Sequence, residues 1–154
     1  MQPQRFTTRV AAGPRGQVYL PVPFDPDAVW GAKPVHHVNG TVNDMRVRGP
    51  ISAFGDERGL SLGAAWRRDC GVSAGDAVEA VLTPEGPQRA DLAPDLAEAL
   101  AAHPEAAAFF DSLATFYRKG YLRWVNATTR RPELRAARVA ELITHLAAGR
   151  KERP

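Results

Sequence analysis

The first 85 residues alternate apolar and polar positions with a period of two. This alternation is typical of short strands that have one face buried. Turn-forming pairs such as Gly13-Pro14 and Gly75-Asp76 separate the strands. We predict six or seven short strands, whose runs begin near Phe6, Val18, Val38, Met45, Leu60 and Val78. A small barrel is the expected arrangement, because closure removes the exposed edges that an open sheet would leave.

The same stretch contains an internal repeat. A shift of 40 positions superimposes apolar positions of the two halves, for example Leu20 on Leu60 and Val38 on Val78. Each half also holds a short helical turn that ends at a glycine suited to the left-handed conformation. These turns are 25–30, begun by Asp25 as cap and followed by Gly31, and 65–70, followed by Gly71. We therefore predict a duplicated barrel with a strand–strand–turn–strand unit in each half.

Beyond Leu82 the apolar pattern changes to the period of helices. We predict four helices, which begin at Pro94, Pro104, Thr115 and Pro132, with Thr115 as a cap and Gly149 as the stop of the last one. The fold class is therefore α+β, a small barrel followed by a helical segment of three to four helices. The predicted organisation is a barrel over 1–85, a linker over 86–93, the helical segment over 94–149 and a frayed tail over 150–154.

Composition is that of an ordinary globular protein. Of the 154 residues, 44% are hydrophobic and 24% are charged, which excludes wholesale disorder. No apolar run approaches the roughly 20 residues that a membrane span needs, and residues 1–9 lack the apolar core of a signal peptide. We therefore expect a cytoplasmic protein without a membrane span.

The residues that could carry chemistry form no catalytic constellation. His36 and His37 are neighbours on a predicted strand, so their side chains point to opposite faces and cannot chelate one ion together. Cys70 is the single cysteine, and at the end of a helical turn we expect it to be a small buried hydrophobe. No serine stands in a nucleophile-elbow context. We expect no catalytic residue, no metal and no cofactor, and hence a protein that is not an enzyme.

One stretch of the helical half is strongly basic. Between Thr115 and Arg138 seven basic side chains stand against one acid, Glu133. Two interpretations are open, a solvated helical face and a face that binds anions. If the chain binds an anion or nucleic acid, the candidate contacts are arginines of the barrel and of the helices: Arg46, Arg48, Arg67, Arg68, Arg118, Arg123, Arg131, Arg135 and Arg138.

Three aromatic side chains recur at helical spacing in the third predicted helix. Tyr117, Tyr121 and Trp124 stand at i, i+4 and i+7. Such a stripe is typical of a core face, and we expect Tyr121 and Trp124 to be buried together with Leu142. The alternative is a platform on which nucleobases stack.

Two stretches resemble known families. Val22-Pro23-Phe24-Asp25, Val38-Asn39-Gly40-Thr41-Val42 and Trp66–Val78 resemble a bacterial β-barrel domain of unknown function. Pro94–Leu100, Phe109-Phe110, Tyr121–Val125 and Arg135–Val139 resemble the YdeI/OmpD-associated family, whose helical segment is often described as bacteriocin protection. The first resemblance implies a double-split barrel of the class that includes AbrB and MazE, with one chain supplying both halves.

These resemblances imply an uncharacterised bacterial protein that acts by binding, linked to envelope stress or bacteriocin protection, with a protein partner that the sequence does not name. An alternative is nucleic-acid binding, as in an AbrB-like regulator, through the barrel or the basic helices. A second alternative is an enzyme or a small-ligand binder. Both a monomer and a homodimer are open.

Overall fold

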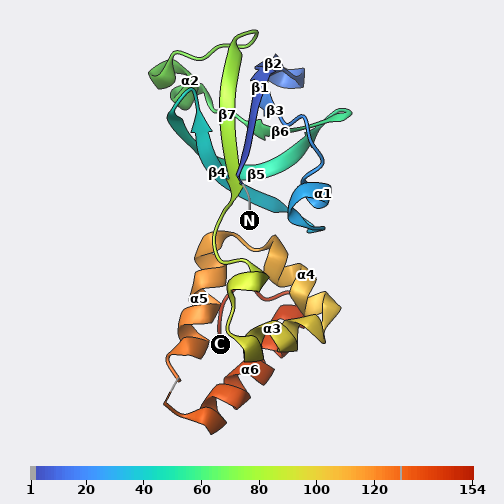
Figure 1. Cartoon of the computed structure of the whole chain (residues 1–154), viewed down its shortest axis with the longest axis vertical. Coiled ribbons are helices and arrows are strands. Elements are labelled where there is room, and N and C mark those ends of the chain that lie inside the picture. Colours follow the sequence, from blue (N-terminus) through green and yellow to red (C-terminus); the bar gives the residue numbers. More distant parts are fainter. Residues whose placement is uncertain (1–2, 129) are drawn as a thin grey trace. The chain divides into compact units, whose positions relative to one another are not determined.

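The chain divides into two compact units, each with its own hydrophobic core. The computed structural model describes residues 3–128 and 130–154. The first unit is Met1–Pro84 and the second is Glu85–Pro154 (Figure 1). The first is built of strands and the second of helices, which confirms the predicted α+β class. Within the described residues no helix combines the length and the hydropathy that a membrane crossing requires.

The first unit is a seven-stranded antiparallel sheet that curls into a nearly closed barrel (Figure 1). Its strands are β1 (Gln4–Arg9), β2 (Ala11–Ala12), β3 (Val18–Pro21), β4 (His36–Val42), β5 (Met45–Phe54), β6 (Glu57–Ser61) and β7 (Ala77–Pro84), in the order β1-β7-β4-β5-β6-β3-β2. All six predicted strands are present. The short β2 continues β1 beyond the buried Val10 and adds the seventh strand.

Strand pairing follows the predicted repeat. The two strands β3 and β6, which are counterparts 40 residues apart, pair with each other and set Leu20 opposite Leu60. The counterparts β4 and β7 also pair, and they approach very closely at Gly40. A Cβ atom at Gly40 would lie 1.7 Å from the carbonyl oxygen of Val81, so only glycine is compatible with this pairing. The barrel core therefore draws equivalent side chains from both halves.

A short helix precedes the third strand of each half, as the repeat predicts. These helices are α1 (Pro26–Trp30) and α2 (Ala64–Cys70). The Asp25 side chain accepts a hydrogen bond from the backbone N–H two residues later and caps α1, as expected. Gly71 ends α2 in the left-handed conformation, with φ 68° and ψ 31°. Gly31 differs, because its positive φ of 89° is combined with an extended ψ of 150°.

The second unit contains the four predicted helices. They are α3 (Pro94–Ala101), α4 (Pro104–Ser112), α5 (Thr115–Asn126) and α6 (Pro132–Ala147), preceded by a single 3-10 turn, η2 (Arg89–Asp91). A proline stands at the first position of α3, α4 and α6. The cap of α5 differs from the expectation: Ala114 has the extended cap conformation, and Thr115 is already the first helical residue.

Leucines and two aromatic side chains fill the core of this unit. Tyr121 and Phe110 are fully buried with Leu142, as expected for Tyr121 and Leu142. Trp124 is only half-buried, in contrast to the expectation. The Arg138 guanidinium lies over its ring, 5.1 Å from the ring centroid.

The stretch that we predicted to be a linker belongs to the second unit. Arg118 of α5 is 3% exposed and donates from Nη1 to the carbonyl of Pro87 at 2.8 Å and from Nη2 to that of Glu85 at 2.7 Å. Gln88 is buried and opens η2 through a capping box with Asp91. These bonds hold residues 85–91 against α5, so the segment is ordered structure.

Candidate anion-binding groove

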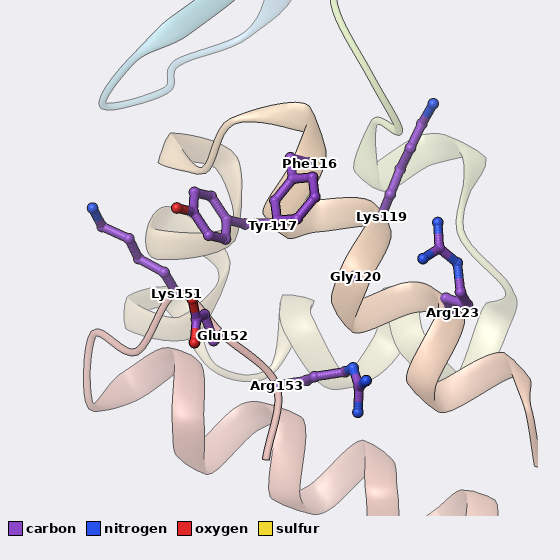
Figure 2. A pocket seen from close by; sticks show the side chains of 8 residues that line it. All are labelled: Phe116, Tyr117, Lys119, Gly120, Arg123, Lys151, Glu152 and Arg153. Atoms are coloured by element: carbon purple, nitrogen blue, oxygen red, sulfur yellow. The ribbon is translucent and has the colours of Figure 1, made fainter.

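The second unit carries an open groove of about 500 Å³ with α5 on one side and the C-terminal tail, residues 150–154, on the other (Figure 2). We call it the α5 groove. It is lined by Phe116, Tyr117, Lys119, Gly120, Arg123, Lys151, Glu152 and Arg153. Its volume lies in the range of small-molecule binding sites.

One face of α5 supplies the first wall. Positions 116, 119, 120 and 123 are three or four residues apart, so they lie on the same side of the helix. Lys119 and Arg123 are separated by about 6 Å along the helix axis, at a rise of about 1.5 Å per residue. Phe116 stands at the head of this face with 78% of its surface exposed. The wall therefore combines a bare aromatic ring with two long cationic side chains.

Glycine forms the floor of the groove. Gly120 lies between Lys119 and Arg123 on α5, and a Cβ atom built there would meet no atom within 4 Å. Glycine inside a helix costs about 1 kcal/mol relative to alanine. Because no packing contact requires glycine here, glycine lowers helix stability at a position where a side chain would extend into the groove.

The C-terminal tail supplies the second wall, and a buried tyrosine holds it. The Tyr121 hydroxyl lies 2.6 Å from the carbonyl oxygen of Arg150 and 2.9 Å from that of Glu152, and its single proton is shared between them. Burial raises the pKa of Tyr121, so it remains a donor well above neutral pH. The Lys151 ammonium also lies 5.9 Å from the centroid of the Tyr117 ring. The tail was expected to fray, and these contacts tie it to α5 instead.

The groove is strongly cationic. Four basic side chains line it against one acid, Glu152, a formal charge of +3. Within residues 3–128 and 130–154 no carboxylate pairs with Lys119, Arg123 or Arg153. Arginines elsewhere do have such partners, for example Arg58 with Asp25. These three cations are therefore available to bind an anion from solution.

Of the five helical arginines that the sequence nominated, only Arg123 lines the groove. Arg118 is buried against backbone carbonyls, and burial lowers the pKa of its guanidinium while the charges of Asp111 and Glu85 raise it. Arg131 is exposed at the start of α6 and does not line the groove. The basic run therefore points in several directions.

The other two helical arginines hold the helices together. The Arg135 guanidinium binds both carboxylate oxygens of Asp95 at 2.6 and 3.0 Å and also donates to the Asn126 side chain. This pairing keeps the pKa of Asp95 below its usual value. Arg138 donates to the carbonyl of Trp124 at 2.7 Å. Arg135 and Arg138 thus pin α6 to its neighbours.

The four barrel arginines lie outside the groove. Arg46 and Arg48 are exposed on the outer face of β5, on either side of the buried Val47. Arg67 donates from Nε to the carbonyl of Leu62 at 3.0 Å, and Arg68 lies 3.5 Å from the carboxylate of Asp69. Arg67 and Arg68 also line a shallow cavity of about 350 Å³.

The two histidines take opposite sides of β4, as predicted. His36 is buried, with Nε2 2.6 Å from the Asp27 carboxylate, and this hydrogen bond lowers the pKa of Asp27. His37 is only half-buried. Among the described residues no three histidine, cysteine or acidic side chains gather as a metal site requires. Cys70 is half-buried, less than expected, and packs against the barrel core.

Two family models match the chain, and together they cover both units. Residues 6–82 match the model of a domain of unknown function, DUF1905. The chain belongs to the DUF1905 family. Residues 89–149 match the OmdA model, described as bacteriocin-protection, YdeI or OmpD-associated. No curated protein matches the chain.

Of the eight residues that line the groove, the sequence nominated only Arg123 as an anion contact. Phe116, Lys151 and Arg153 were not nominated, and neither was Gly120. The helical spacing of Phe116, Gly120 and Arg123 was a readable signal, because it sets them on one side of α5. The contribution of the tail had no such signal, since it depends on where the Tyr121 hydroxyl finds its partners.

Proposed function

We propose that this chain is a non-enzymatic binding protein and that the α5 groove is the surface with which it captures an anionic partner or ligand. The observation that carries this proposal is the set of cations around an exposed aromatic ring, with Lys119, Arg123 and Arg153 lacking acidic partners among the described residues. A cationic cleft attracts anions and raises their local concentration. The proposed setting, protection against bacteriocins, comes from the description of the OmdA model.

The side chains of the groove favour ligand binding without catalysis. Its lining contains no serine, cysteine or histidine, and Glu152 is the one carboxylate among the lining residues. Among the described lining residues no side chain is hydrogen-bonded to another, so no nucleophile is paired with a base as nucleophilic catalysis requires. We therefore propose that the protein is not an enzyme.

The experiment is a fluorescence anisotropy titration with two labelled polyanions, an oligoglutamate and an oligothymidylate. We expect at least one of them to bind and the double variant Arg123→Gln/Arg153→Gln to weaken that binding at least tenfold. The matched control is Arg46→Gln, which removes an exposed arginine of the barrel. Absence of binding to both probes would overturn the proposal, as would an equal loss in the Arg46 variant.

A second candidate is nucleic-acid binding through the barrel, in the manner of the AbrB class. It is supported by the contact between α2 and β5, where the Trp66 indole donates to the carbonyl of Arg46 at 2.8 Å. This contact brings the arginines of α2 to the part of β5 that carries Arg46. Under this alternative, Arg46→Gln/Arg68→Gln abolishes oligothymidylate binding, and the groove variant leaves it unchanged.

A further inference from the structure

We infer that the α5 groove binds single-stranded nucleic acid, with a base stacked on Phe116 and the phosphates held by cations of α5 and of the tail. This inference rests on the proposed function, because it names the chemistry of the anion that the groove takes. Three features of the groove favour a nucleic-acid strand over an acidic polypeptide: the bare ring, the spacing of the cations and the glycine floor.

The exposed ring of Phe116 favours a ligand with a planar apolar face. Phe116 is the most exposed of the large hydrophobic side chains that the structure describes, at 78%, followed by Val29 and Leu134 at 39% and 37%. It meets the Tyr117 ring at 87°, so the two rings do not stack on each other and Phe116 keeps ring surface for a ligand. Nucleobases stack on such rings whatever their sequence, whereas acidic side chains offer no flat apolar face.

The basic side chains follow both walls of the groove at a spacing that suits a nucleic-acid backbone. Lys119 and Arg123 stand one helical turn apart, about 6 Å along the axis, which is close to the separation of successive phosphates in a single strand. Arg153 and Lys151 project from the tail on the other wall (Figure 2). A strand that enters the groove therefore has cations on both sides of its backbone.

The size of the groove selects a single strand. About 500 Å³ is room for one or two nucleotides and not for a duplex, whose cross-section is far larger. Gly120 keeps the floor free between the two cations of α5, since any side chain there would rise into this space. A sugar can therefore lie against the helix backbone while its base reaches Phe116.

Tyr121 is the positioning residue of this site. It is fully buried and does not line the groove, but its hydroxyl bonds the carbonyls that flank Lys151. The tail cations therefore face α5 only while this hydroxyl holds the chain. We expect Tyr121→Phe to weaken strand binding although no lining side chain is changed.

The test is anisotropy on the full chain with labelled oligothymidylate, a duplex of matched length and oligoglutamate, together with calorimetry of thymidine monophosphate. We expect oligothymidylate to bind most tightly, with a slope of log K against log salt of about −1.4 to −2 for the two or three phosphates that flank one or two nucleotides. Phe116→Ala should weaken it about 5- to 150-fold, the equivalent of losing one stacked base. The matched control Leu134→Ala removes an exposed side chain of the same unit and should change nothing.

The outcomes separate the inference from the proposed function. If oligoglutamate binds more tightly than oligothymidylate and Phe116→Ala has no effect, the groove is an anion site and the nucleic-acid inference is overturned. If thymidine monophosphate or the duplex binds as tightly as oligothymidylate, the groove does not select a single strand and the inference is wrong. If no probe binds, both the inference and the proposed function fail.

Discussion

Gly120 offers a substitution whose effects on stability and on binding have opposite signs. It lies in the middle of α5, and a Cβ atom there would meet open space. Replacing glycine inside a helix by alanine gains about 1 kcal/mol, and leucine gains nearly as much. Gly120→Leu should therefore raise the midpoint of thermal unfolding, by roughly 4–8 °C if the second unit of 70 residues unfolds as its own transition.

The same leucine side chain occupies the floor of the α5 groove. It blocks the space that a bound strand or peptide would occupy. We therefore expect the Gly120→Leu variant to bind at least tenfold more weakly, a loss of about 1.4 kcal/mol. Gly120→Ala is the matched control, because it gives the same helix gain with a single methyl group. Calorimetric unfolding and anisotropy titration measure the two effects on the same samples.

Two results would refute this reasoning. If Gly120→Leu lowers the unfolding temperature, the space above the glycine is not free and the floor has been misidentified. If it raises that temperature but leaves affinity for both polyanions unchanged, the ligand binds elsewhere. The expected pattern, a more stable protein that binds less, cannot arise from general damage to the fold.

Three further predictions concern the framework. Tyr121→Phe should cost about 1 kcal/mol of unfolding free energy and increase amide exchange in residues 150–154; unchanged exchange would show that the hydroxyl does not hold the tail. Asp95→Asn should cost about 1 kcal/mol at pH 7, since the pair with Arg135 is partly exposed. That pairing lowers the pKa of Asp95 from 3.8. The difference in unfolding free energy between the wild type and the variant, measured by urea titration, should therefore be full above pH 3.8 and vanish as the pH falls through the lowered pKa. A difference that persists in acid would rule out the ion pair. Gly40→Ala should cost more than about 3 kcal/mol, because its Cβ overlaps the carbonyl of Val81; a native-like unfolding midpoint would contradict this pairing.

The secondary structure was predictable because its determinants are local. Pro94, Pro104 and Pro132 each open a helix at the position where a missing N–H costs nothing. Alternation of apolar positions located the six longer strands. The 40-residue shift identified Leu20 and Leu60 as equivalent positions, and the structure adds that they lie opposite each other. The two-residue strand β2 could not be located, because it is too short to show an alternating pattern.

The direction of each arginine was not predictable from the charge run. Arg118 and Lys119 are neighbours, yet one is buried and the other lines the groove. Arg118 is drawn inward by carbonyls some 30 residues earlier in the chain, and Arg135 is paired with Asp95, 40 residues away. Such partners are fixed by the packing of the helices, and periodicity reports only which positions are apolar.

The role of the tail was hidden for a similar reason. Residues 150–154 are polar and lie at the end of the given chain, a pattern typical of fraying. The helical pattern correctly indicated that Tyr121 is buried, but it contains no information on where a buried hydroxyl finds its acceptor. The bonds to Arg150 and Glu152 turn this tail into a wall of the groove.

Mapping of backbone amide shifts by NMR during titration with oligothymidylate tests the central claim most directly, because it locates the bound strand without any substitution. We predict that the largest shifts fall on residues 116–123 and 151–153, on both walls of the α5 groove. Shifts gathered on the barrel around Arg46 and Arg68, or no shifts at all, would contradict the account.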